Sequence, residues 1–213
     1  MEEGLEVQFG GCCWLMHSDH TLHQPDTQTL VLADLHIGKI AHFRRAGVAV
    51  PAAARMETQD RLMRSIEVHQ PKRIVIAGDL FHSAANKDTE YFIEALVAPH
   101  QHIEWIWVPG NHDEATTRMY APFFQRTATE FEIAGVRIVH ESVNAETPTI
   151  SGHIHPVVYL SHKGRLKTKH RCFVLEGNNL LLPAYGAFTG GYRITPRSSG
   201  RYFITTERAV YEL

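Results

Sequence analysis

Short apolar runs that end in polar or glycine-rich loops divide the first half of the chain. Runs with strand character cover residues 29–33, 73–77 and 104–108, and each leads directly into a cluster of Gly, Asp, Pro or Asn. Helical patterns lie between them, at residues 51–69 and 88–97. Alternating strands and helices are typical of parallel strands joined by helical crossovers, so we expect an α/β sheet.

The second half of the chain has a different pattern. Short predicted strands follow one another through tight connections, and Ala134-Gly135 and Gly177-Asn178 are typical of hairpin turns. These strands cover residues 131–133, 136–140, 149–151, 157–160, 171–175 and 180–182. We expect a mostly antiparallel second sheet that packs face to face on the first, with helices outside. No linker or repeat interrupts residues 1–213, which favours a single domain.

Length, charge and cysteine usage narrow the class of protein. A chain of 213 residues with 44% hydrophobic residues can bury a sizeable core without disulfides or structural metals. Its net charge of -2 gives no overall attraction to polyanions, so a nucleic-acid contact has to come from a local patch or an active site. The chain has three cysteines, Cys12, Cys13 and Cys172, and their spacing is not that of a metal site. An odd number argues against a disulfide framework and favours a reducing compartment. With no signal peptide or membrane span visible, we expect a cytoplasmic protein that does not bind a membrane.

Histidine is the unusual count, at fifteen residues, and several histidines fall where predicted strands end. Five clusters of metal-capable residues occupy such positions: Asp34-Leu35-His36, Gly78-Asp79, Gly110-Asn111-His112-Asp113, the single His140 and Gly152-His153-Ile154-His155. Any one of them is more often ordinary loop chemistry or a surface histidine. Five in succession after apolar strands are hard to explain that way, because a packed core has no use for them. Since ligands collect at the carboxyl ends of strands, we expect the clusters to converge.

The types of residue in these clusters favour a catalytic metal site. Carboxylate, amide and imidazole groups without cysteine suit Mn, Fe or Zn better than a thiolate zinc site or an all-oxygen calcium site. These clusters offer at least seven ligands, which exceeds the need of one ion, so we predict two ions that share a bridging carboxylate. Two ions about 3.5 to 4 Å apart can clamp a phosphate, lower the pKa of a bridging water and stabilise an in-line displacement. The implied reaction is phosphoester hydrolysis.

The five clusters, in this order, resemble the metal signature of the calcineurin-like metallophosphoesterases, over residues 34–155. The resemblance implies an α/β fold, a four-layer αββα sandwich with two mixed β-sheets. It also implies one ion held by Asp34, His36, Asp79 and His155, and a second held by Asp79, Asn111, His140 and His153. Asp79 is then the bridge. In the same family pattern His112 orients the scissile phosphate or protonates the leaving oxygen, and Asp113 holds His112.

Three further segments make the resemblance more specific. The string Gly78-Asp79-Leu80-Phe81-His82 lacks the Asp-Arg-Gly triplet of the protein phosphatases and resembles the repair nucleases. Residues 32–39 and 182–191 resemble the bacterial ligase-associated DNA damage response endonuclease family. That resemblance implies a metal-dependent phosphodiesterase or nuclease in DNA repair, with a DNA ligase and a helicase as partners. We expect two divalent transition-metal ions, manganese first, with iron or zinc as alternatives.

Candidate substrate contacts each have a second, plainer interpretation. Lys39, Arg44 and Arg45 follow the first ligand loop and suit phosphate oxygens at the rim of the site, although solvated helix-edge charges explain them equally well. His82 is expected to contact substrate or a nearby carboxylate, or else to be an exposed loop histidine. The basic run at residues 162–171 is either a solvated hairpin or a surface that follows a nucleic-acid backbone.

Other functions remain open from the sequence. A small- or cyclic-nucleotide phosphodiesterase is the alternative enzyme, and a scaffold that has lost catalysis is the alternative class of protein. The scaffold is disfavoured because no ligand is missing, and a structural zinc domain is disfavoured because the chain has no Cys-x-x-Cys pair. Five further histidines have no ligand partner at useful spacing and receive no role: His17, His20, His23, His100 and His102.

Overall fold

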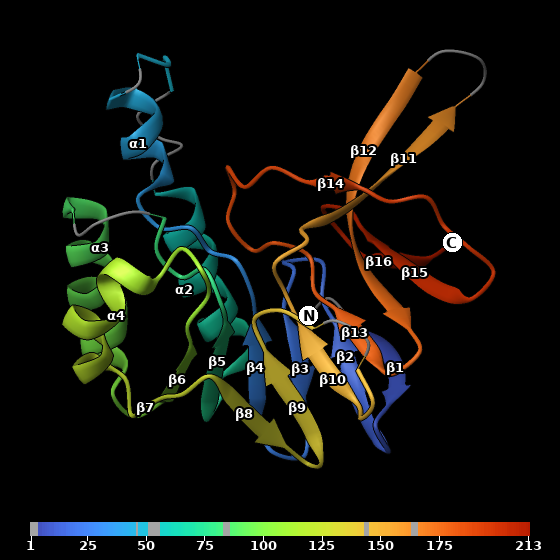
Figure 1. Ribbon diagram of the computed structural model, residues 1–213, viewed down its shortest axis with the longest axis horizontal. Helices are drawn as coiled ribbons and strands as arrows, with labels where there is room; N and C mark the ends of the chain where they lie inside the picture. Colours follow the sequence, from blue (N-terminus) through green and yellow to red (C-terminus); the bar gives the residue numbers. More distant parts are fainter. Residues whose placement is uncertain (1–3, 46, 51–55, 83–85, 143–144, 163–165) are drawn as a thin grey trace.

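The computed structural model describes residues 4–45, 47–50, 56–82, 86–142, 145–162 and 166–213, and it contains two sheets that lie face to face (Figure 1). The first sheet has the strand order β1-β2-β3-β4-β5-β6-β7. Pairing is antiparallel from β1 to β4 and parallel from β4 to β7. The strands are β1 (Leu5–Phe9), β2 (Cys12–Met16), β3 (Leu22–Gln24), β4 (Thr29–Leu32), β5 (Arg73–Ala77), β6 (Glu104–Val108) and β7 (Arg126–Thr127).

The central strands β4, β5 and β6 are almost wholly buried because both of their faces are covered. Val31, Val75 and Ile106 belong to the core between the sheets, while their neighbours along each strand pack against the helices. The predicted strands at residues 73–77 and 104–108 are confirmed at their bounds, and the one at 29–33 ends one residue earlier.

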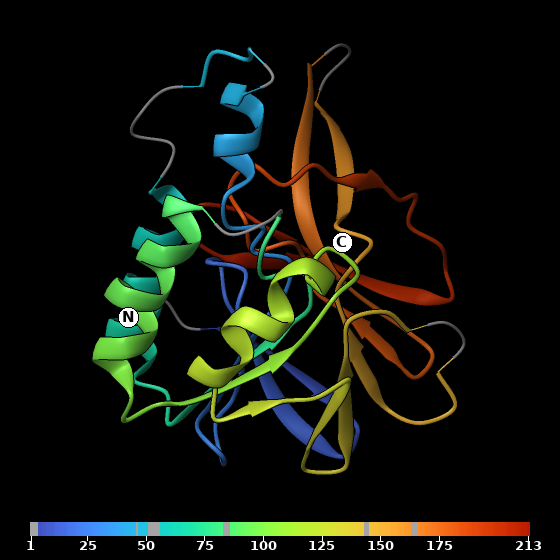
Figure 2. The ribbon, with the colours of Figure 1, turned by 60° about the vertical axis from the view of Figure 1, so that its left-hand side comes forward.

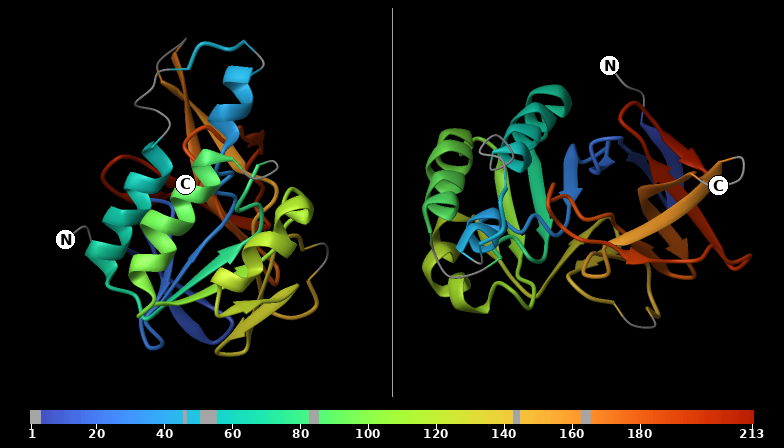
Figure 3. Two further views of the ribbon diagram at one scale, coloured as in Figure 1. Left: turned by 90° about the vertical axis from the view of Figure 1, so that its left-hand side faces the viewer. Right: turned by 90° about the horizontal axis from the view of Figure 1, so that it is seen from above.

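Helices α2 (Glu57–His69), α3 (Lys87–Phe92) and α4 (Glu114–Tyr120) cover the face of the first sheet that is turned away from the second sheet (Figures 1 and 3). Helix α1 (Lys39–Arg45) stands beyond the carboxyl ends of the strands (Figure 1). The predicted helix at 88–97 is confirmed as α3 together with the π-helical turn η2 (Ile93–Val97). Two 3-10 turns follow helical segments: η3 (Ala98–His100) comes after η2, and η4 (Ala121–Phe123) comes after α4. The predicted helix at 51–69 is confirmed from Glu57, and residues 51–55 lie outside the described part of the chain.

The second sheet is mixed, with β10 parallel to β9 and β13 and β11 parallel to β14. Its central order is β14-β11-β12-β13-β10-β9-β8, and β15 and β16 extend it beside β12. Both predicted hairpin turns are confirmed, and Ala134 and Gly135 have φ of 50° and 79° as a tight hairpin requires. The strands are β8 (Glu130–Ile133), β9 (Val136–Val139), β10 (Thr149–Ser151), β11 (Pro156–His162), β12 (Leu166–Glu176), β13 (Asn179–Leu181), β14 (Tyr192–Arg193), β15 (Gly200–Thr205) and β16 (Val210–Glu212).

The two mixed sheets and the α/β class agree with the expected fold, with one correction to the layers. Among the residues that the structure describes, α-helices cover only the first sheet (Figure 3). The outer face of the second sheet instead carries a small apolar cluster that includes Val158, Cys172 and Tyr202. The three cysteines are free thiols. No helix in the described ranges is long and apolar enough to cross a membrane.

Candidate metal centre

The predicted ligands lie on loops that follow β4, β5, β6, β9 and β10, where the carboxyl ends of these strands meet. Most of these residues have a left-handed backbone, which is unfavourable for any residue with a side chain and accumulates at functional sites. They are Asp34, His36, Asp79, His153 and His155, with φ between 42° and 71°. The fold therefore stabilises several strained residues in one place.

Backbone hydrogen bonds join these loops. The amide of Asp34 donates to the carbonyl of Gly78 at 3.1 Å, and the amide of His36 donates to the carbonyl of Asp79 at 2.9 Å. The Asp34 carboxylate accepts from the amide of His153 at 2.9 Å through Oδ2. Its other oxygen, Oδ1, is buried and has no hydrogen-bond partner. An unpaired buried carboxylate oxygen is costly, and it is suited to a cation.

The first group of ligand atoms comes from Asp34, His36, Asp79 and His155, all within 4.8 Å of one another. The Nε2 atoms of His36 and His155 are 3.4 Å apart, and His155 Nε2 lies 3.6 Å from Asp34 Oδ1. Bonds of about 2.0 to 2.2 Å to one ion place its ligands roughly 3 to 3.5 Å apart. These four residues therefore fit a divalent ion.

The second group comes from Asp79, His140 and His153, with Asn111 beside it. His140 Nε2 lies 3.0 Å from His153 Nδ1, 3.0 Å from Asn111 Oδ1 and 3.6 Å from Asp79 Oδ1. The other oxygen of this carboxylate, Asp79 Oδ2, lies 3.7 Å from His36 Nε2 in the first group. One carboxylate thus turns one oxygen toward each group, which is the geometry of a bridge. The structure brings together all seven predicted ligands, and their binding of metal stays a prediction.

Two glycines make this close approach possible. A Cβ atom on Gly78 would overlap the ring of His140, and one on Gly110 would meet the Asp79 carboxylate. Gly78 also has φ of 82°, which favours glycine. The Gly-Asp and Gly-Asn pairs seen in the sequence therefore have a steric cause.

The electrostatics of the site favour neutral imidazoles, which are the form that binds metal. Burial and, next, the charge of Lys39 hold the pKa of His36 well below its usual value. Burial and Lys39 likewise lower the pKa of His82 to about 4. Lys39 is half-buried; burial lowers its pKa, and the nearby carboxylates of Asp79 and Asp34 partly offset this effect. Lys39 is thus a cation placed beside the two acids of the site.

His112 and His82 lie at the solvent side of the site. The exposed ring of His112 stacks on that of His82 with centroids 5.4 Å apart, and it meets the ring of His36 edge-on at 5.2 Å. The amide of His112 donates to Asp79 Oδ1 at 3.0 Å. The imidazole of His112 is in neither ligand group, so it can face a substrate.

Asp113 corrects an expectation. Its buried carboxylate accepts hydrogen bonds from the amides of Leu80, Phe81 and Gly110 and from the indole of Trp107, at 2.8 to 3.3 Å. No hydrogen bond in the described part of the chain joins it to the side chain of His112. Burial raises the pKa of Asp113 to about 6, against the hydrogen bonds that lower it. Asp113 holds the loops after β5 and β6 together rather than holding His112.

The expected substrate contacts are only partly described. Arg44 is exposed on α1, while the side chain of Arg45 and residues 163–165 of the basic run lie outside the described residues. Lys167 and Lys169 are exposed on β12. Their roles in binding a substrate stay predictions.

Arg171 is a residue of the site that the sequence did not reveal. Its guanidinium donates to the carbonyls of Ala184, Gly186 and Ala187 at 2.9, 2.6 and 3.1 Å. This loop in turn donates from the Gly186 amide to the carbonyl of Asp34 at 3.1 Å. Arg171 thus fixes the loop that packs on the first metal-ligand segment, although it stands in a run that looked solvated. The family-like segment 182–191 was the available signal.

Two solved structures of other proteins are similar to this chain to different degrees. Among solved structures, the chain is similar to the nuclease MPE of Pseudomonas putida, with a TM-score of 0.82 and 29% identity over 99% of this chain and 100% of that chain. It is also similar to YfcE, a phosphoesterase from E. coli, with a TM-score of 0.48 and 16% identity over 87% of this chain and 97% of that one. A search of curated proteins gives no significant match.

A model of the calcineurin-like phosphoesterase family matches residues 27–185, a range that contains every predicted metal ligand. The chain therefore belongs to the calcineurin-like phosphoesterase family and is a metal-dependent phosphoesterase.

Proposed function

We propose that this protein is a nuclease that hydrolyses phosphodiester bonds in DNA and uses two divalent metal ions. The observation that supports it most strongly is Asp79, whose two carboxylate oxygens face two separate ligand groups. When bound, two ions polarise the phosphate and supply a nucleophile at neutral pH. The expected ion is manganese, and the expected setting is DNA repair in the cytoplasm with a ligase and a helicase as partners.

His112 has the geometry of the group that acts on the leaving oxygen. It is exposed beside His36, and its own amide is fixed by Asp79. An imidazolium there can donate a proton to the departing alkoxide oxygen, which typically accelerates such a step about 10²- to 10⁴-fold. Lys39 is positioned to balance the phosphate charge from the side of α1.

The charges around the site favour a diester over a monoester. A monoester dianion needs additional cationic clamps, usually bidentate arginines. Here Arg171 and Arg61 donate instead to backbone carbonyls of the loop at 184–187. A diester carries a single charge, so Lys39 and the metal ions suffice for it.

The shape of the molecule favours a polymer over a small nucleotide. Strand β11 begins one residue after His155, and the β11–β12 hairpin extends from the same end of the molecule as α1 (Figures 1 and 2). Lys167 and Lys169 are exposed on this hairpin. Cations placed beyond the metal centre can contact phosphates on either side of a cleaved bond. The nuclease from P. putida, which is similar over its whole length, supports the same class of substrate.

The proposal is tested by comparing kcat/KM for bis-p-nitrophenyl phosphate and p-nitrophenyl phosphate with Mn²⁺. We expect the diester to be favoured by roughly tenfold or more, which corresponds to about 1.4 kcal/mol. A preference for the monoester would overturn the assignment. A second assay compares circular single-stranded DNA with cyclic nucleotides, and faster hydrolysis of cyclic nucleotides would favour the alternative enzyme. The Asp79→Asn protein, purified in parallel, controls for contaminating nucleases.

A further inference from the structure

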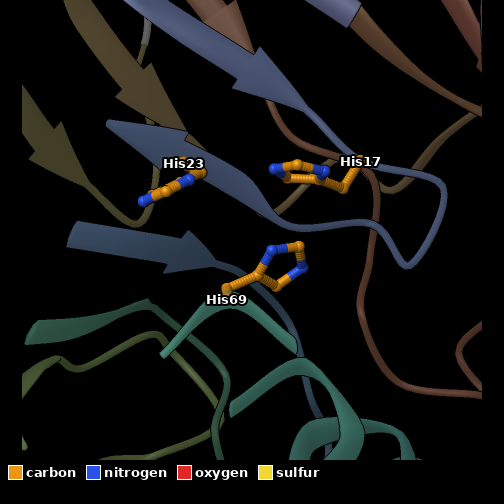
Figure 4. A group of neighbouring side chains, drawn as sticks. All are labelled: His17, His23 and His69. Atoms are coloured by element: carbon orange, nitrogen blue, oxygen red, sulfur yellow. The ribbon is translucent and has the colours of Figure 1, made fainter. Parts of the chain in front are cut away.

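Three histidines from separate elements meet outside the metal centre (Figure 4). His17 directly follows β2, His23 lies in β3, and His69 is the last residue of α2. One ring nitrogen of each lies within 4.8 Å of the other two. The ring centroids of His17 and His69 are 4.2 Å apart, and that of His23 is 6.0 Å from each. Figure 4 shows the three rings around a common space. We call this group the histidine triangle.

Two nitrogen atoms of the histidine triangle are buried without a partner. The Nε2 atoms of His17 and of His23 are inaccessible to water and make no hydrogen bond, and His17 as a whole is only 8% exposed. Leaving a buried polar atom unpaired is unfavourable. The unpaired Nε2 of His17, with a ring nitrogen of His23 and of His69 close by, is best explained by a ligand that contacts one nitrogen of each ring.

The third histidine has a carboxylate behind it. His69 Nε2 lies 3.1 Å from Asp19 Oδ2, which leaves Nδ1 of the same ring free to bind. Asp19 also accepts hydrogen bonds from Thr21 and from the hydroxyl of Ser65 at 2.7 Å. Burial opposes ionisation of Asp19, but these hydrogen bonds outweigh it and hold its pKa below the usual value. A metal-binding histidine usually has such a carboxylate on its other nitrogen, which fixes the tautomer.

The surroundings also keep the imidazoles in the neutral form that binds metal. Burial is the main cause that lowers the pKa of His17, to about 4, and that of His23, so both rings are neutral at neutral pH. His69 ends α2, where the helix dipole favours positive charge. A surface cleft of about 540 Å³, lined by His17, Asp19 and His69 among others, connects the histidine triangle with solvent. Arg61 and Arg64 also line this cleft, and Glu67 is the second acid there.

We propose that His17, His23 and His69 bind one zinc ion that is separate from the metal centre and joins strands β2 and β3 to the end of α2. Three imidazoles without a carboxylate ligand suit zinc, whereas manganese prefers oxygen ligands. Zinc–nitrogen bonds of about 2.0 to 2.1 Å place the nitrogens roughly 3.4 Å apart, so small side-chain rotations close the site. A water completes the tetrahedron. This proposal does not rest on the proposed function.

The test is a zinc titration of the full-length protein against a chromophoric chelator, with matched histidine variants. His23→Gln removes a ligand, and His102→Gln removes an exposed histidine outside the triangle. We expect the number of tight sites per chain to fall by one in His23→Gln and to stay unchanged in His102→Gln. Asp19→Asn should retain the site with about 10- to 100-fold weaker affinity, because it acts through His69. Equal zinc counts in the His23→Gln and His102→Gln proteins would overturn the proposal.

Anomalous scattering at the zinc edge gives a second, direct readout that does not depend on activity. Crystals of the His102→Gln protein should show a peak between the three rings, and crystals of His23→Gln should not. Absence of the peak from the His102→Gln protein, or its persistence in His23→Gln, would contradict the proposal. If His23→Gln does not fold, His69→Gln takes its place, with the same expected results. The zinc count and the anomalous peak do not depend on phosphodiester hydrolysis. Failure of the zinc proposal can therefore be distinguished from failure of the proposed function.

Discussion

The metal centre and the histidine triangle are both rich in histidine, but they are constructed differently. The metal centre combines carboxylates with imidazoles on loops whose backbone is repeatedly left-handed. In the histidine triangle, all the candidate ligand atoms are imidazole nitrogens. Its residues lie in a strand, just after a strand and at the end of a helix, and none of the three has a left-handed backbone. Its one carboxylate, that of Asp19, is not among the three candidate ligands and instead forms a hydrogen bond with His69.

The two sets of ligand atoms suit different ions. Carboxylates attract hard divalent ions at any pH near neutrality, and a strained, pre-organised loop set can hold two of them for catalysis. Neutral imidazoles select a softer ion and lose it when they are protonated. We therefore expect mutations in the two regions to affect activity and stability separately.

The largest effect is expected from Asp79→Asn, which removes the charge that the two ligand groups share. The variant should lose tightly bound metal and lower kcat/KM by about 10³-fold or more, or about 4 kcal/mol. Metal analysis after desalting and the bis-p-nitrophenyl phosphate assay measure both losses. If full activity remained, the two groups would not form one centre.

His112→Ala should separate chemistry from metal binding within the same centre. Its imidazole lies outside both ligand groups, so the variant should keep its metal and lose about 10²- to 10⁴-fold in kcat. A substrate with a p-nitrophenolate leaving group needs less protonation and should lose less than DNA. An emptied metal centre in this variant would show that His112 is a ligand instead.

The pH dependence of stability should report the histidine triangle. In the metal-free protein His17 has a pKa of about 4, while in the unfolded chain its pKa is near 6.5, so the unfolded state binds the proton first. The stability from His17 is fully present above pH 6.5 and is lost as pH falls toward 4, by on the order of 3 kcal/mol. Urea unfolding in chelator at several pH values measures this loss.

Other buried histidines contribute to the same pH dependence, so the change between variants is decisive. His17→Asn should flatten the slope between pH 6.5 and 4, whereas His102→Gln should leave it unchanged. A slope that is the same in all three proteins would show that His17 is not the group protonated on unfolding.

The smallest effect is expected on the β11–β12 hairpin. Lys167→Glu combined with Lys169→Glu should weaken DNA cleavage. It should also make the slope of log kcat/KM against log salt concentration shallower by roughly one to two, since each lost phosphate contact lowers this slope by about one. The small diester should be spared. Lys72→Glu, an exposed charge reversal just before β5, is the control. Equal losses on both substrates would instead indicate damage to the fold.

The sequence predicted best the elements whose burial is simplest. Strands β5, β6 and β10 were found at their bounds, because buried strands are continuous apolar runs that end in turn residues. The seven predicted ligands could be singled out because each lies in a loop just after such a strand, and their binding of metal stays a prediction. The strands of residues 5–24 were not predicted, since Cys12–Met16 has no polar alternation to distinguish a strand.

Contacts between distant residues were beyond the sequence. Arg171 looked like one more charge in a basic run, because nothing in its neighbours shows the loop carbonyls that it binds. His17 and His23 seemed to lack a partner because His69 belongs to a helix far along the chain. The expected contact between Asp113 and His112 was wrong for the same reason. The Asp113 carboxylate accepts hydrogen bonds from backbone amides of two loops that are distant from each other in the sequence.

Anomalous scattering from crystals of the Mn²⁺-saturated protein tests whether Asp79 bridges two ions. We expect two manganese peaks about 3.5 to 4 Å apart, with one oxygen of Asp79 directed at each. Asn111, His140 and His153 should surround one peak, and Asp34, His36 and His155 the other. A single peak, or two peaks that do not share Asp79, would contradict this bridging role.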